Sequence, residues 1–205
     1  MSERPKESWG SGDAYELWVG RWSRIIGGAF VDWLAIPPGQ TWGDVGCGTG
    51  ALAGCILGRS DPAGVLGVDR SEAYVCEARN RVGDARARFE VGDACALPWT
   101  TATCDVTVSG LVLNFVPDSD AMVHEMVRVT RPGGRVAAYV WDYAGGMQMI
   151  RHFWDVALEL NRDDAQLDQA ERFPLCQPDP LEQLFRRVGL NSVSVRAIDV
   201  PTVLR

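Results

Sequence analysis

The chain has 205 residues and a formal net charge of −7, with 46% hydrophobic and 23% charged residues. These proportions are ordinary for a globular protein and sufficient for a substantial core. The acidic balance argues against nucleic acid as the main partner, because neutralising phosphates requires a surplus of Lys and Arg. No stretch approaches the roughly 20 apolar residues that span a bilayer, so we expect no membrane span.

Cysteine usage and the N-terminal residues favour a cytoplasmic protein without a metal centre. The six cysteines form no Cys-x-x-Cys pair, so we expect buried, reduced thiols rather than disulfides or zinc ligands. The first twelve residues are polar and charged, unlike a secretory signal peptide. A cytoplasmic location follows as the expectation.

The chain is expected to begin with an aromatic-rich helix over residues 13–34. Large apolar residues recur there at near-helical spacing, among them Tyr15, Trp22 and Phe30. Pro37-Pro38-Gly39 then breaks the pattern.

Short apolar strands alternate with helices through the rest of the chain. Strands are expected at residues 41–45, 65–68, 87–91, 105–109, 135–141 and 192–200. Helices are expected at residues 51–57, 72–80, 119–130, 147–160 and 181–188. This alternation is typical of an α/β fold with a doubly wound, mostly parallel sheet. We expect a single domain over residues 1–205, made of a helix at 13–34, a core at 41–141 and a C-terminal segment at 146–205.

A glycine-rich loop lies between the first expected strand and its helix. It reads Asp44-Val45-Gly46-Cys47-Gly48-Thr49-Gly50, with glycine at alternate positions. Such spacing allows a tight turn and a close approach of backbone to a ligand. The N–H groups at the start of the following helix favour a polar or anionic group. A glycine-rich loop alone is weak support for a ligand site, since a merely tight turn has the same composition.

Acidic residues follow the next two strands as well. Asp69 ends the second strand about 20 residues beyond the glycines, where a carboxylate can accept hydrogen bonds from ribose hydroxyls. Asp93 follows the third strand and can accept from an exocyclic amine of adenine. With Asp44, three successive strand ends then present a carboxylate at the edge where open α/β sheets bind ligands.

These motifs resemble the class I S-adenosylmethionine-dependent methyltransferases, specifically the small-molecule group typified by ubiquinone/menaquinone methyltransferases. The resemblance covers residues 15–141. Its matching segments are Asp44–Gly50, Gly67-Val68-Asp69-Arg70-Ser71, Gly92-Asp93-Ala94 and Arg131-Pro132-Gly133-Gly134.

The resemblance implies a cofactor site for S-adenosyl-L-methionine and a small-molecule methyl acceptor. The glycine loop would line the methionine part, Asp69 would hold the ribose, and Asp93 would meet the adenine edge. The first helix would close the site, with Arg21 suited to pairing a carboxylate. The full implied set is Tyr15, Arg21, Trp22, Asp44, Gly46, Cys47, Gly48, Gly50, Asp69, Arg70, Asp93, Ala94, Ser109 and Leu111.

The sequence assigns no catalytic residue. Methyl transfer from a sulfonium is an in-line displacement, so positioning the acceptor supplies much of the rate and a base is needed only when a proton must leave. Trp141, Asp142, Tyr143 and His152 follow the fifth strand, on the expected acceptor side. His124 is expected to be a surface or packing residue.

Two features depart from the family pattern. Gly43 replaces the usual large aliphatic residue before Asp44, which we expect to weaken the strand by about 1–3 kcal/mol. The family sheet has seven strands but only six are expected here, which suggests a C-terminally shortened chain with an open slot or exposed sheet edge.

Two alternatives stay open at this point. Gly46 to Ala51 also fits the looser G-x-G-x-x-A fingerprint of nicotinamide-dependent oxidoreductases. The departures are also compatible with a catalytically impaired or non-catalytic protein that retains the fold as a binding module. The methyl acceptor and the oligomeric state are not indicated.

Overall fold

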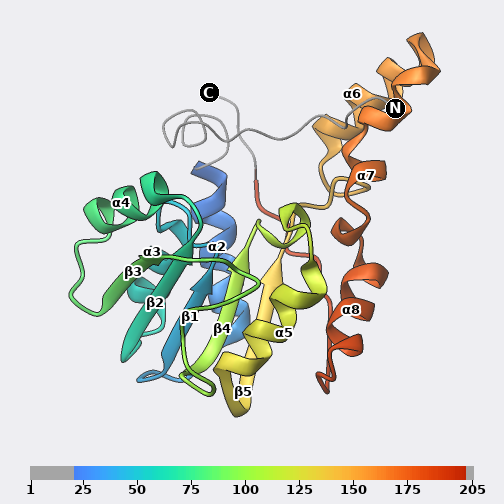
Figure 1. Ribbon diagram of the computed structural model, residues 1–205. Helices are drawn as coiled ribbons and strands as arrows, with labels where there is room; N and C mark the ends of the chain where they lie inside the picture. Colours follow the sequence, from blue (N-terminus) through green and yellow to red (C-terminus); the bar gives the residue numbers. More distant parts are fainter. Residues whose placement is uncertain (1–20, 202–205) are drawn as a thin grey trace.

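In the computed structural model of the chain, the described residues are 21–201 (Figure 1). They contain one five-stranded sheet in the order β3-β2-β1-β4-β5, in which every neighbouring pair is parallel. The strands are β1 (Thr41–Val45), β2 (Gly64–Asp69), β3 (Ala87–Val91), β4 (Cys104–Gly110) and β5 (Thr130–Tyr139). The predicted doubly wound, parallel α/β fold is confirmed.

Helices cover both faces of this sheet. They are α2 (Arg21–Leu34), α3 (Ala51–Arg59), α4 (Glu72–Arg81), α5 (Ser119–Val129) and α8 (Pro178–Arg187). The helices α6 (Gln148–Leu160) and α7 (Gln169–Arg172) contact the segment at residues 162–167 instead. Buried residues of α2, α3 and α4 form one core cluster with the sheet, and those of α5 and α8 form a second. Two layers of helix therefore bury β1 and β4 on both sides, as their nearly continuous burial requires.

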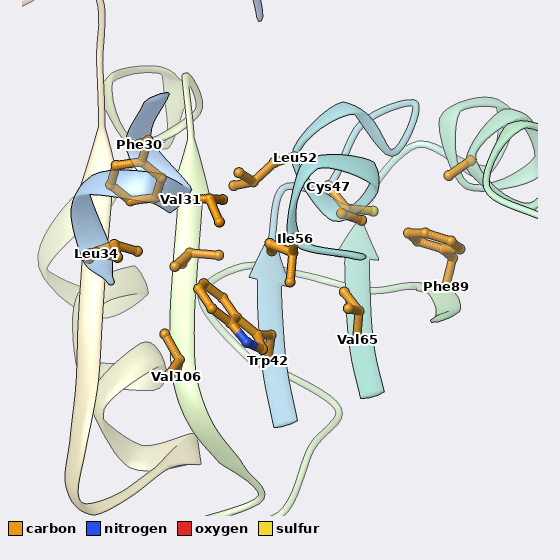
Figure 2. Packing of buried hydrophobic residues seen from close by; sticks show 14 of the residues in the cluster. Phe30, Val31, Leu34, Trp42, Cys47, Leu52, Ile56, Val65, Phe89 and Val106 are labelled. Atoms are coloured by element: carbon orange, nitrogen blue, oxygen red, sulfur yellow. The ribbon is translucent and has the colours of Figure 1, made fainter. Parts of the chain in front are cut away.

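The first cluster fixes α2 and α3 on one face. Figure 2 shows Phe30 and Leu34 of α2 packing beside β4 and β5, with Ile56 of α3 above Trp42 of β1. Phe30, Trp42 and Ile56 are fully buried. Because burial of each large side chain contributes about 2–3 kcal/mol, this contact holds the glycine loop's strand and helix in place.

Local signals in the sequence account for several helix ends. The Ser71 hydroxyl accepts a hydrogen bond from the Tyr74 N–H, and Asp118 caps α5 through the Ala121 N–H. Gly189 ends α8 with a left-handed φ of 86°, and its N–H donates to the Arg186 carbonyl. Ser71 thus begins α4 and Gly189 ends α8 through hydrogen bonds with neighbouring backbone.

The expected cost of Gly43 is not supported by the packing. A Cβ at Gly43 would lie 2.9 Å from Trp99 Cζ3 and 3.0 Å from Cys104 Sγ. The indole of Trp99 therefore fills the volume that a large aliphatic residue on β1 would occupy. A side chain from a loop distant in sequence thus takes the place of the one that Gly43 lacks. The sequence around Gly43 does not indicate this contact.

The predicted strand over residues 192–200 is wrong for this structure. Within the described residues these positions form no strand, and β5 pairs only with β4. Val193 and Ile198 still pack against the two core clusters. The sheet thus ends at β5, with the chain passing nearby but not joining it.

The predicted first helix is described only in part. It begins at Arg21 as α2 in the described residues, and residues 13–20, including Tyr15, lie outside them. The apolar face of α2 packs on α3 and the sheet through Ile26, Phe30 and Leu34.

Candidate functional site

The candidate site lies where the strand order reverses. β1 lies between β2 and β4, so the loops that leave the carboxyl ends of β1 and β4 diverge to opposite sides of the sheet. Such a switch point forms the ligand crevice of open α/β sheets. The residues 46–50 and 111–115 leave the sheet here.

The glycine loop closes a tight turn that starts α3. The N–H groups of Gly46 and Cys47 both donate to the Val68 carbonyl, and the Gly50 N–H donates to the Cys47 carbonyl at 2.9 Å. Gly50 is the N-cap of α3 and has no side chain to occupy the first N–H groups of that helix. Apart from the Ala53 N–H, which faces Asp44, the N–H groups of this first turn can therefore favour a polar ligand group.

Two glycines of the loop have different surroundings. A Cβ at Gly46 would lie 2.6 Å from the Val112 side chain, so Gly46 is required for packing between the β1 and β4 loops. Gly48 also has a left-handed φ, of 51°, but a Cβ there would have no described atom within 4 Å. Gly48 therefore borders open space, and it is the position at which a bound molecule can approach the backbone.

Asp44 lies buried beneath this loop. It is 1% exposed, and neither carboxylate oxygen has a hydrogen-bond partner within the described residues. Burial, and secondly the Asp69 charge, raises the pKa of Asp44 to about 7, although the nearby Ala53 N–H acts in the opposite direction. A buried carboxylate without a hydrogen-bond partner lowers the stability of the fold. Such groups are concentrated at functional sites, so Asp44 is a candidate site residue.

Asp69 joins the ends of β1 and β2. Its Oδ2 accepts from the Gly48 N–H at 3.0 Å and its Oδ1 from the Ser71 N–H at 2.9 Å. Each carboxylate oxygen retains a further lone pair, so Asp69 can hold the loop and accept hydrogen bonds from a ligand together. Arg70, the next residue, is exposed.

Asp93 follows β3 on the same edge. The Gly92 N–H donates to the Asp69 carbonyl at 3.0 Å, which brings the turn after β3 alongside the end of β2. Asp93 is exposed, Ala94 is half-buried, and the Asp93 carboxylate accepts from the Cys95 N–H. Asp44, Asp69 and Asp93 thus lie at the carboxyl ends of three adjacent strands.

Cys47 has no properties of a nucleophile. The thiol is buried, and burial together with the charges of Asp44 and Asp69 raises its pKa, so it stays protonated. All six cysteines are free, but only Cys47, Cys104 and Cys176 are buried, so the expectation of buried thiols is wrong for the other three.

The end of β4 contributes a strained backbone. Leu111 has φ 62°, uncommon for a residue with a side chain, and its N–H donates to the Tyr139 carbonyl. The Ser109 hydroxyl is fully buried and donates to the Val45 carbonyl at 2.7 Å, so it links β4 to β1. Asn114, three residues beyond Leu111, has a buried Nδ2 without a partner in the described residues. The sequence motifs did not single out Asn114, and its unpaired amide is a signal that only the structure gives.

Aromatic side chains gather on the expected acceptor side. The rings of Phe115 and Tyr143 lie 5.1 and 5.6 Å from the ring of Phe173, which precedes α8. The Asp142 carboxylate accepts from the N–H groups of residues 144–146, so it organises the turn before α6.

Other predicted residues lie on a groove beside β5, away from the glycine loop. Trp22, Trp141 and His152 line this groove. His124 is exposed on α5, as expected. Arg21 is the first described residue and only its backbone can be placed.

The described residues contain neither a membrane-spanning helix nor a metal-binding cluster. Over residues 21–201, no helix is long and apolar enough to cross a bilayer. The same part of the chain contains no cluster of three or more His, Cys, Asp or Glu side chains that could hold a metal ion.

Comparisons with known proteins agree with this geometry. A family model described as a methyltransferase domain matches residues 43–138. The ubiquinone/menaquinone biosynthesis C-methyltransferase of Cereibacter sphaeroides is 37% identical over 131 residues, which cover 62% of this chain and 49% of that protein. The 2-methyl-6-phytyl-1,4-hydroquinone methyltransferase of Synechocystis is 33% identical over 58% of this chain and 38% of that protein. The chain thus spans about half the length of these relatives or less.

Solved structures agree on the fold. A candidate S-adenosyl-L-methionine-dependent methyltransferase of Methanococcus maripaludis superposes with a TM-score of 0.65 at 20% identity, covering 94% of this chain and 90% of that one. The sheet order occurs in methyltransferases and in nicotinamide-dependent oxidoreductases alike, whereas the comparisons support the methyltransferase interpretation and nothing in them favours the oxidoreductase. Residues 43–138 therefore match the methyltransferase-domain family, and the chain has the Rossmann-like fold seen in class I S-adenosylmethionine-dependent methyltransferases.

Proposed function

We propose that this chain binds S-adenosyl-L-methionine at the β1–β2–β3 edge and transfers its methyl group to a small molecule. The observation that carries the proposal is the buried, unpaired Asp44 carboxylate beneath a loop that is open at Gly48. A cationic ligand group near Asp44 would supply the missing partner and favour the ionised carboxylate. When bound, the cofactor supplies an electrophilic methyl group on its sulfonium.

The residues of this edge fit that cofactor. We propose that Asp69 accepts from the ribose hydroxyls with the lone pairs left free by Gly48 and Ser71. Asp93 and Ala94 would meet the adenine edge, and Arg70, Gly46, Cys47, Gly50, Ser109 and Leu111 complete the proposed set. For Ser109 and Leu111 the proposed contact is through backbone, because the Ser109 hydroxyl is engaged by Val45.

We further propose that the acceptor is a small aromatic molecule of the hydroquinone type. The two relatives named above are methyltransferases of ubiquinone/menaquinone biosynthesis and of a phytyl hydroquinone. The cluster of Phe115, Tyr143 and Phe173 supplies ring faces and edges beyond β4 and β5, which suit stacking against an aromatic ring. A cytoplasmic location is part of this proposal.

The cofactor proposal is tested by calorimetric titration with S-adenosylhomocysteine. Three proteins are compared: the native chain, Asp69→Asn, and Asp155→Asn, whose exposed carboxylate on α6 is a matched control. We expect saturable binding by the native chain and the control, and at least tenfold weaker binding by Asp69→Asn. NADH serves as the control ligand. Binding of NADH in place of S-adenosylhomocysteine, or equal affinity of all three proteins, would contradict the proposed site.

The acceptor class is tested separately by mass spectrometry. The native chain is incubated with S-adenosylmethionine and either 1,4-naphthohydroquinone or histamine. A methylated naphthohydroquinone alone supports the proposal, whereas methylation of histamine alone contradicts the acceptor class but leaves the cofactor site intact.

A further inference from the structure

The connection between β3 and β4 is tied to α5 by two oppositely charged side chains. Glu125 and Arg128 lie three residues apart on α5 and form an ion pair of 2.6 Å. Both also bind the backbone of residues 92–103, the connection that carries Asp93 and Ala94. We propose that this ion pair positions Asp93 against the exocyclic amine of adenine and so determines the preference of the site for that base. This inference rests on the proposed function and adds two positioning residues to it.

The ion pair holds both backbone groups of Leu97. The Leu97 N–H donates to Glu125 Oε2 at 2.8 Å, and the Leu97 carbonyl accepts from Arg128 Nη2 at 3.1 Å. Arg128 Nη1 also donates to the Trp99 carbonyl at 2.9 Å. The planar guanidinium thus bridges two carbonyls and one carboxylate, which the point charge of a lysine does not reproduce. The hydrogen bond from Arg128, and secondly that from the Leu97 N–H, lowers the pKa of the Glu125 carboxyl group, so it is ionised at neutral pH.

The turn that carries Asp93 is anchored on both sides. Before it, the Gly92 N–H donates to the Asp69 carbonyl at 3.0 Å, which ties the turn to the end of β2. Within it, the Ala96 N–H donates to the Asp93 carbonyl at 3.1 Å. Leu97 follows directly, so a closed turn joins Asp93 to the residue that α5 holds. The position of Leu97 therefore determines the position of Asp93.

The Asp93 carboxylate has an oxygen that can meet a ligand. Its Oδ1 accepts from the Cys95 N–H at 2.8 Å, which fixes the orientation of the side chain. Its Oδ2 accepts no hydrogen bond from the part of the chain that the structure describes. A charge-assisted hydrogen bond to an amine depends on distance and angle, and a displacement of about 1 Å removes most of it. The preference for adenine therefore depends on how firmly the turn is held.

α5 is a rigid support, and the connection does not depend on the ion pair alone. α5 packs along β4 and β5 (Figure 1), and its residues Met122 and Met126 are fully buried. Leu97 and Trp99 are buried in the core cluster that includes α5 and α8, and the Trp99 Nε1 donates to Glu90. Loss of the ion pair should therefore loosen the turn while the connection stays packed on the fold.

Calorimetric titration with two ligands tests the proposal. The ligands are S-adenosylhomocysteine and its 6-deamino analogue, in which a hydrogen atom replaces the exocyclic amine. The variants are Glu125→Ala and Arg128→Lys. The matched controls are Glu182→Ala and Arg186→Lys, because these residues form an ion pair on α8 that does not contact the β3–β4 connection.

We expect the native chain and both controls to bind S-adenosylhomocysteine at least tenfold more tightly than the analogue. In Glu125→Ala and Arg128→Lys this preference should fall to threefold or less. Their affinity for the analogue should change less than twofold, since the analogue lacks the amine that Asp93 would accept from. Retained affinity for the analogue also shows that the variants are folded.

Two results would overturn the inference. One is a preference that persists in both Glu125→Ala and Arg128→Lys. The other is an equal loss of affinity for the two ligands, which is what an ion pair with a merely structural role would cause. The native chain separates this inference from the function on which it rests. If the native chain bound neither ligand, or both equally, the proposed cofactor site would itself be contradicted, and this inference with it.

Discussion

Replacing Asp44 by Asn should reveal the cost of the buried carboxylate. Burial, and secondly Asp69, raises the pKa of Asp44 from 3.8 to about 7 in the folded chain. Between these values the unfolded chain is ionised while the folded chain keeps its proton. The native state therefore binds more protons, and its stability falls as pH rises from about 4 to about 7. Each pKa unit corresponds to ~1.4 kcal/mol, which gives a total loss of about 4 kcal/mol.

The assay is urea unfolding of the native chain and Asp44→Asn at pH 5 and pH 8. Asn has nearly the same volume as Asp but does not ionise. The contributions of all other titrating groups therefore cancel when the unfolding free energies of the two proteins are subtracted. Relative to the native chain, Asp44→Asn should gain about 3 kcal/mol of unfolding free energy between pH 5 and pH 8. A difference that is independent of pH, or that changes in the opposite direction, would refute the assignment of a raised pKa to Asp44. The variant should also bind S-adenosylhomocysteine more weakly.

Three further predictions concern packing, the loop and the C-terminal helices. Gly43→Val should destabilise the chain by about 1–3 kcal/mol in urea unfolding, because its side chain meets Trp99, and in a double mutant with Trp99→Ala the two losses should add to less than their sum. Gly48→Ala should cost only about 1–2 kcal/mol from its left-handed φ, but weaken S-adenosylhomocysteine binding at least tenfold in calorimetry, since its methyl group enters the open space. Asp168→Asn should cost about 3 kcal/mol in thermal unfolding, because the 6% exposed Asp168 carboxylate accepts two hydrogen bonds of 2.7 Å from Arg151. Unchanged melting of that variant would show that the ion pair is not formed in solution.

Local patterns predicted the sheet core well. The strand around Val68 is a continuous apolar run, and the strand that ends at Val45 lies between Pro37-Pro38-Gly39 and the glycine loop, so their positions in the chain followed from composition and spacing. Ser71 and Gly189 marked helix ends because capping depends on neighbouring backbone alone.

Features that depend on distant contacts were not predictable in the same way. Trp99 fills the space beside Gly43 from 56 residues away, which no local pattern records. Residues 192–200 have the composition of a strand, but strand formation needs a partner, and β5 does not pair with them in this structure. The positions of the site residues followed from their strand ends, whereas the bond between Ser109 and Val45 and the unpaired Asn114 amide depend on side-chain orientation.

The account's central claim is that the cofactor binds at the carboxyl edge of β1, β2 and β3. The most direct test is NMR of the ¹⁵N-labelled chain during titration with S-adenosylhomocysteine. The largest shifts are expected at the amides of residues 46–50, Asp69 and Asp93, with small changes at residues 136–140. Shifts concentrated along residues 136–140 and 192–200 would place the ligand in the β5 groove and contradict the account.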